Sequence, residues 1–125
     1  MNIPSELSYT ESHEWVRLSG RTATVGITDY AQDELGDIIY LEFPRVGQEL
    51  TRGEPFGAIE AIKTVADLIA PVSGKVTEVN EGLNDSPEKV NQDPYGEGWI
   101  VKIELSEPVA KESFLTAEAY GQIVQ

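Results

Sequence analysis

Residues 56–79 read FGAIEAIKTVADLIAPVSGKVTEV and contain three short apolar runs. The first two, residues 56–62 and 65–69, are separated only by Lys63-Thr64, which is the length of a tight hairpin turn. A Pro-Val-Ser-Gly turn then leads into a third run at residues 75–79. We therefore expect three consecutive strands, with Lys63 at the tip of the first hairpin.

The flanking sequence predicts further β structure. Residues 13–18 and 22–27 flank a Gly-containing turn and predict a second hairpin, and residues 37–43 form another strand-like run. Residues 98–105 alternate as a closing strand. Many short strands with little helix indicate a mainly β protein, an all-β barrel or sandwich, built as a single domain over residues 1–125.

Short helices are expected at two places. Thr28 or Asp29 can cap a helix that runs through Leu35, because both side chains accept hydrogen bonds from a first helical turn. Residues 106–120 are expected to form a C-terminal helical segment that opens at Ser106 and carries a proline in its first turn. Helix therefore plays a minor part in the predicted fold.

The composition predicts the kind of partner that the protein meets. The chain has 22 acidic and nine basic residues, a net charge of −13, which repels phosphate backbones and anionic lipid surfaces. We therefore expect basic protein partners and neither nucleic acid nor membrane. No long apolar run or targeting segment is evident, so we expect a cytoplasmic protein of bacterial type, although a mature mitochondrial form with an added Met would look the same. We also expect a monomer.

Few residues suit catalysis or metal binding. The chain lacks cysteine, which removes disulfides, thiolate metal sites and a cysteine nucleophile, and His13 is the only imidazole. Ser12, His13 and Glu14 are neighbours on an expected strand and have no nucleophile elbow around them. We predict no catalytic group and no metal site.

Lys63 is the residue most suited to carry chemistry. Most lysines are solvated surface charges, but this one is expected to project from a tight turn between two apolar strands. A modifying enzyme can reach such a tip while the sheet holds the backbone rigid. An amide on the lysine nitrogen removes the charge and adds a flexible tether, so that one reactive group can visit several active sites.

Five motifs stand out, and they read YTESHEWV at 9–16, VGITDYAQ at 25–32, LGD at 35–37, APVSG at 70–74 and NQDPYGEGW at 91–99. Through these motifs the chain resembles the H-protein family of the glycine cleavage system over residues 7–120. The family's lipoylated lysine lies in a Glu-Ser-Val-Lys pattern, which falls on Lys63, although this chain reads Glu-Ala-Ile-Lys. Both departures are small and still allow the turn.

The resemblance implies a barrel-sandwich hybrid fold, as in lipoyl and biotinyl carrier domains, with lipoate bound covalently to Lys63. It also implies a shuttle that carries an aminomethyl group from glycine decarboxylase (P protein) to aminomethyltransferase (T protein). Dihydrolipoamide dehydrogenase (L protein) then reoxidises the arm, and a lipoate ligase or lipoyl transferase attaches it.

Two alternative functions share this attachment site. A biotin carrier has a similar scaffold, but such carriers place methionines on both sides of the lysine, where this chain has Ile62 and Thr64. A lipoate relay that modifies other lipoyl domains shares every attachment feature.

The resemblance also suggests a shelter for the loaded arm. H proteins hold the charged intermediate in a surface cleft, and Ser12, Glu14 and Asp67 match the residues that contact it. Carboxylates can hold a protonated amine, and a desolvated site would exclude the water that hydrolyses the intermediate. The alternative is that all three are solvated surface groups.

Overall fold

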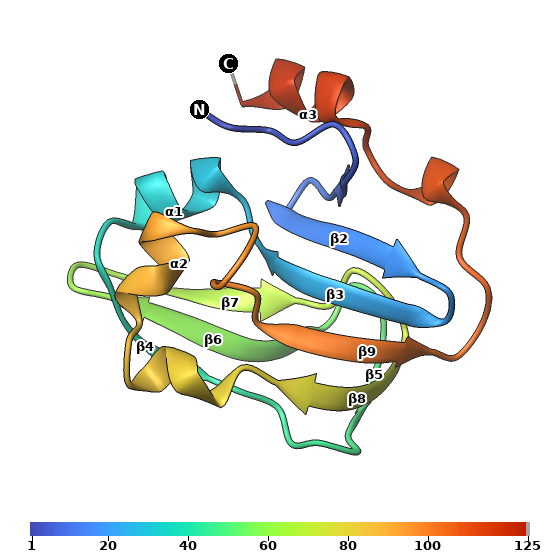
Figure 1. Ribbon diagram of the computed structural model, residues 1–125, viewed down its shortest axis with the longest axis horizontal. Helices are drawn as coiled ribbons and strands as arrows, with labels where there is room; N and C mark the ends of the chain where they lie inside the picture. The colour runs from blue at the N-terminus through green and yellow to red at the C-terminus, as the bar shows by residue number, and fades with distance from the viewer. Residues whose placement is uncertain (125) are drawn as a thin grey trace.

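The computed structural model describes residues 1–124 and contains two antiparallel sheets (Figure 1). Six strands form the larger sheet in the order β1-β2-β3-β9-β8-β5, and β4-β6-β7 form the smaller one. The expected barrel-sandwich hybrid is confirmed. The strands are β1 (Ser8–Tyr9), β2 (Glu14–Ser19), β3 (Thr22–Ile27), β4 (Ile38–Glu42), β5 (Glu49–Leu50), β6 (Pro55–Ala61), β7 (Val65–Ile69), β8 (Gly74–Val79) and β9 (Val101–Leu105).

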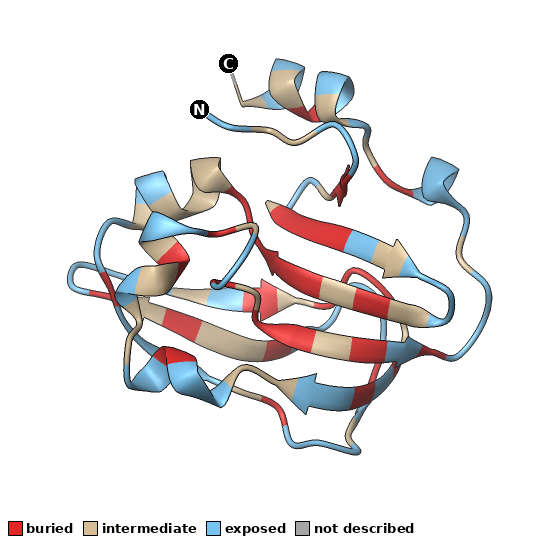
Figure 2. Cartoon of the chain, in the orientation of Figure 1, coloured by how far each residue is buried: buried red, intermediate tan, exposed pale blue. Residues whose placement is uncertain are grey.

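The main core lies between the two sheets. Along β9, alternate residues are buried, which gives the strand its banded red colour in Figure 2. Ile103 of β9 and Val25 of β3 are buried in the same cluster as Ile59 of β6. Fully burying an aliphatic side chain of this size contributes about 1.5–3 kcal/mol. The apolar alternation that marks the strands in the sequence therefore also stabilises the pairing of the sheets.

A second cluster ties the two ends of the chain together. Tyr9, Trp15 and Tyr120 are fully buried in it, and the rings of Tyr9 and Tyr120 stack with centroids 4.9 Å apart. Tyr120 belongs to α3 (Ala117–Ile123), which lies beside the N-terminal segment in Figure 1. Because Trp15 belongs to β2, this cluster also fixes the position of the strand that carries Glu14.

The helix after β3 forms as the sequence predicts. In α1 (Asp29–Leu35), Thr28 is the capping residue, and its Oγ1 accepts a hydrogen bond from the N–H of Ala31 at 3.2 Å. Gly36 follows the helix with φ of +80°, a conformation that favours glycine.

None of the helices described is long and apolar enough to cross a membrane.

The C-terminal prediction was wrong in extent. Residues 106–116 hold only η2 (Lys111–Ser113), and α3 begins eleven residues after Ser106, where Thr116 caps it through the N–H of Ala119. The physical reason is a long-range backbone pair: Leu115 donates to Tyr9 O at 2.8 Å and accepts from Tyr9 N at 2.9 Å. That pair requires extended backbone, which excludes a continuous helix.

The free edge of β4 is covered by two short helices. Asn84 of η1 (Glu81–Asn84) accepts from the N–H of Leu41 at 2.9 Å and donates to its carbonyl at 3.1 Å. Asn91 of α2 (Glu88–Gln92) accepts from the N–H of Ile38 at 3.1 Å. Two asparagine side chains thus supply the hydrogen bonds that a neighbouring strand would make.

Candidate functional site

Lys63 lies at the tip of the β6–β7 hairpin. The N–H of Ala61 donates to Thr64 O at 2.8 Å, and the N–H of Ile62 donates to Asp37 O at 3.1 Å, so backbone hydrogen bonds hold both sides of the tip. Residues 62–65 are exposed, and the hairpin tip is pale blue in Figure 2. Within residues 1–124 the ion pairs are Lys89–Glu97 and Lys102–Glu78, which leaves the Lys63 amine outside any pair. A rigid backbone therefore presents an accessible amine.

A hollow of about 350 Å³ lies between this tip and the end of α1, and we call it the tip hollow. Three acidic residues line it, and none of its lining residues other than Lys63 is basic. In a chain of net charge −13, this concentrates negative charge beside the exposed amine. The lining residues are Asp33, Glu34, Leu35, Gly36, Asp37, Ile62 and Lys63.

A second hollow of about 180 Å³ brings the three predicted sheltering residues together. We call it the β7 hollow, because one of its walls is the outer edge of β7. Its lining residues are Ser12, His13, Glu14, Ile27, Tyr30, Ala31, Glu34, Leu35, Ile59, Ala66, Asp67 and Leu68. Glu34 and Leu35 line both hollows, so the two form neighbouring depressions along α1.

Glu14 is the most buried acid of the β7 hollow, with 2% of its surface exposed. Its Oε1 accepts from Thr10 Oγ1 at 2.7 Å and from Ser12 Oγ at 2.5 Å, and its Oε2 lies 3.4 Å from the N–H of Ile69. Burial raises the pKa of Glu14 above its ordinary value, and these hydrogen bonds oppose that rise. The carboxyl group is desolvated but remains oriented.

Ser12 was expected to contact the arm, but its hydroxyl already donates to Glu14 Oε1. Ser12 is therefore placed to orient the carboxylate. Thr10 has the same role and was missed by sequence reasoning: its Oγ1 also accepts from the N–H of Glu14 at 3.1 Å. Asp67, by contrast, is exposed on the rim of the hollow.

His13 does not join Ser12 and Glu14 in a catalytic relay. Its Nδ1 lies 2.9 Å from the hydroxyl of Tyr120, while Ser12 donates directly to Glu14. The imidazole also packs at 4.9 Å from the ring of Tyr30. Burial lowers the pKa of His13, and the nearby carboxylate of Glu34 opposes that change. Sequence reasoning did not assign His13 and Tyr30 to this hollow.

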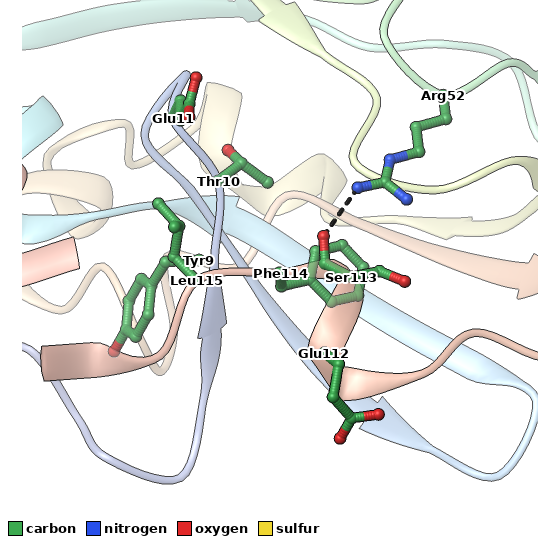
Figure 3. Close-up of a pocket in the computed structure, with 8 residues that line it drawn as sticks. All are labelled: Tyr9, Thr10, Glu11, Arg52, Glu112, Ser113, Phe114 and Leu115. Carbon is green, nitrogen blue, oxygen red and sulfur yellow. Dashed lines mark hydrogen bonds between the residues drawn. The ribbon is translucent and has the colours of Figure 1, made fainter. Parts of the chain in front are cut away.

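A larger hollow of about 370 Å³ contains none of the predicted site residues. In Figure 3 the side chain of Arg52 reaches toward η2, where its Nη2 donates to Ser113 O at 2.9 Å. The guanidinium also lies 5.2 Å from the ring centre of Phe114. Arg52 therefore holds residues 113–114 against the barrel, which is a structural role.

Within the described residues, no group of three or more acidic or histidine side chains is arranged to hold a metal ion.

Comparison with known proteins identifies similar chains. Residues 7–125 match the family described as Glycine cleavage H-protein. A glycine cleavage system H protein of Anoxybacillus flavithermus is 54% identical over 99% of this chain and 98% of its own, and one of Rubrobacter xylanophilus is 56% identical over 96% and 93%. The crystal structure of a glycine cleavage system H protein from Mycobacterium marinum superposes with a TM-score of 0.86, at 38% identity, covering 96% of this chain and 98% of that one.

Proposed function

The chain belongs to the glycine cleavage H-protein family, and from this premise we propose that Lys63 carries a lipoyl group as an amide on Nζ. The protein is the lipoyl carrier of the glycine cleavage system and shuttles between its P, T and L proteins. When bound, the lipoyl group supplies the sulfur chemistry that takes up and hands on an aminomethyl group. The biotin-carrier and lipoate-relay alternatives are not needed to explain the family match.

The position of Lys63 is the observation that carries this proposal. Three of the five lysines, Lys63, Lys75 and Lys111, are exposed, but only Lys63 lies in a hairpin turn. An attached group has to enter the active site of another enzyme, so its anchor must project beyond the body of the carrier. Lys75 lies within β8 and Lys111 within η2, so neither projects from the tip of a turn.

The hollows along α1 fit an arm that folds back onto its carrier. Asp67 is four positions beyond Lys63, a distance of at most about 13 Å along extended chain, so an arm anchored at the tip can run beside β7. Leu35 lines both hollows and offers apolar contact to a hydrocarbon chain, while Glu14 and Asp67 offer acceptors to a protonated amine. We propose that Glu14 and Asp67 contact the amine and that Ser12 acts by orienting Glu14.

We further propose that this chain contributes no catalytic group of its own. Its residues hold the arm, orient it and exclude water, while the partner enzymes perform the bond-making steps. The acidic tip hollow supports partners with basic faces, among them the ligase or transferase that attaches lipoate. A monomer suits this role, since an unobstructed tip must enter each partner.

The attachment is tested by modifying the purified protein with lipoate and a lipoate ligase, followed by intact-mass measurement and peptide mapping. We expect one adduct, on the peptide containing Lys63. The Lys63→Arg variant keeps the positive charge but should accept no lipoate and support no glycine cleavage. Lys75→Arg and Lys111→Arg are matched controls that should be modified like wild type. Modification of Lys63→Arg, or an adduct on another lysine, would disprove the assignment.

A further inference from the structure

His13 has an unusual backbone and leaves one ring nitrogen open. Its φ is +71°, in the left-handed region that non-glycine residues seldom occupy, and such strain concentrates at functional sites. Its N–H donates to Thr10 O at 3.1 Å, and its carbonyl accepts from the N–H of Thr28 at 3.1 Å, so the surrounding chain imposes this conformation.

Of the two ring nitrogens of His13, only Nδ1 has a hydrogen-bond partner, Tyr120. No unpartnered side-chain nitrogen or oxygen is buried in the described chain, so Nε2 must be accessible.

Counting protons along the hydrogen-bond chain fixes which ring nitrogen carries the hydrogen. Thr28 Oγ1 accepts from the N–H of Ala31 and lies 2.7 Å from the hydroxyl of Tyr120, which in turn lies 2.9 Å from His13 Nδ1. Thr28 and Tyr120 are both completely buried, and each hydroxyl has one proton to donate. If Thr28 donates to Tyr120 and Tyr120 donates to Nδ1, every proton has an acceptor.

The reverse direction leaves a proton without a partner. If His13 Nδ1–H donated to Tyr120, Tyr120 would donate to Thr28, and the Thr28 hydroxyl proton would have no acceptor within hydrogen-bond distance in a fully buried side chain. Leaving a buried donor unsatisfied costs about 1–3 kcal/mol. The first arrangement is therefore favoured, and it makes Nδ1 an acceptor.

We propose that His13 is an arm-binding residue of the β7 hollow, held by Thr28 and Tyr120 as the neutral tautomer that presents an Nε2–H donor. The proposal extends the function above, because the partner of this donor is an acceptor atom of the arm, a sulfur or the amide carbonyl. The hollow then has two chemically opposite contacts. Glu14 and Asp67 accept from the amine, and His13 donates to an acceptor elsewhere on the arm.

The carboxylates near His13 favour a protonated ring, whereas its burial and its hydrogen-bond chain favour a neutral one. Tyr30 and Glu34 approach it from α1, Tyr120 from α3, and Glu14 and Asp67 line the same hollow. A protonated imidazole would have to donate from Nδ1, which reverses the hydrogen-bond chain. Removing the Tyr120 hydroxyl should therefore make protonation of His13 easier.

Nitrogen NMR tests the tautomer directly, since His13 is the only histidine of the chain. In the unmodified protein at neutral pH, we expect Nε2 to be protonated and Nδ1 to be unprotonated. In Tyr120→Phe, which keeps a ring to stack on Tyr9, we expect a mixture of tautomers and a higher pKa of His13. Tyr40→Phe, at an exposed tyrosine, is the matched control and should leave both unchanged. A protonated Nδ1 in wild type would overturn the proposal without any variant.

The contact with the arm is tested separately by comparing unmodified and lipoylated protein. Lipoylation should shift the Nε2 and Hε2 resonances of His13 in wild type, while Lys63→Arg treated identically should show no shift. If mass measurement finds no adduct on Lys63, the proposed attachment fails but the tautomer result stands. If Lys63 is lipoylated and the Nε2 and Hε2 resonances of His13 do not move, the donor role of His13 is wrong.

Discussion

The hairpin tip and the β7 hollow are only four residues apart along one strand, yet they are built in opposite ways. At the tip, Ile62 and Val65 are 66% and 63% exposed, and hydrogen bonds of the backbone hold the turn. In the hollow, Glu14 is 2% exposed and its side chain accepts from Thr10 and Ser12. Attachment requires access, whereas shelter requires a dry and oriented acceptor. One strand, β7, serves both because it runs from the open tip into the hollow.

The largest effect is expected when the hollow loses its oriented charge. Glu14→Gln keeps the shape but removes the carboxylate that we propose to hold the amine, and a hydrogen bond to a charged group contributes about 1.5–3 kcal/mol. Loaded protein without the transferase should therefore release formaldehyde roughly tenfold faster. Asp67→Asn, at the exposed rim, and Ser12→Ala, which acts through Glu14, should have smaller effects. Equal formaldehyde release from wild type and the three variants would show that none of these side chains shelters the loaded arm.

Electrostatic attraction should distinguish the tip from the rest of the surface. Raising ionic strength from about 10 mM to about 150 mM should slow association with the glycine decarboxylase by roughly fivefold, because salt screens exposed charges. Changing Asp33 and Asp37 of the tip hollow to Asn should reduce that salt dependence. The same change in charge at Glu107 and Glu112, which do not line the tip hollow, is the control. Stopped-flow rates that are independent of salt would reject steering.

Glu14 should also make stability depend on pH. Its pKa is raised in the folded protein, so its contribution to stability is present below the ordinary carboxyl pKa and is lost as pH rises through the folded-state value. From about pH 4 to about pH 7, the free energy of unfolding of wild type should therefore fall relative to that of Glu14→Gln. Urea unfolding at a series of pH values measures this difference. A difference that stays constant with pH would show that folding does not raise the pKa of Glu14.

The smallest effect on stability is expected at the tip itself. Ile62→Ser and Val65→Thr alter exposed side chains, so the free energy of unfolding should change by less than about 0.5 kcal/mol. Ile59→Ala, on the buried face of the same hairpin, should instead cost about 2–5 kcal/mol. Denaturant unfolding compares the three variants. A loss at Ile62 similar to that at Ile59 would mean that the tip is packed and not free.

The sequence was informative where a local pattern and the tertiary structure agree. The β6–β7 hairpin and the Thr28 cap were predictable because strand alternation and capping chemistry act over a few residues. The C-terminal helix was misplaced because the helix-start signals at Ser106 and its neighbouring proline were overridden by pairing between Tyr9 and Leu115. The two-residue strands β1 and β5 are too short to produce a periodic signal.

The candidate site also contains residues that the sequence could predict and residues that it could not. Lys63 could be selected from its turn and from the family motif, both of which are local. The role of Ser12 as a support for Glu14 could not, because it depends on which way a side chain points. The link between His13 and Tyr120 joins residues 107 positions apart, and no local pattern in the sequence indicates such a contact.

The two asparagines that cover β4 have a consequence for how the protein behaves at high concentration. An uncovered strand edge offers unpaired N–H and C=O groups to the same edge of another molecule, which is a route to aggregation. The Asn84 side chain occupies both groups of Leu41, and the Asn91 side chain occupies the N–H of Ile38. A side chain cannot extend a sheet from one molecule to the next. The protein therefore has a built-in block to self-association at this edge.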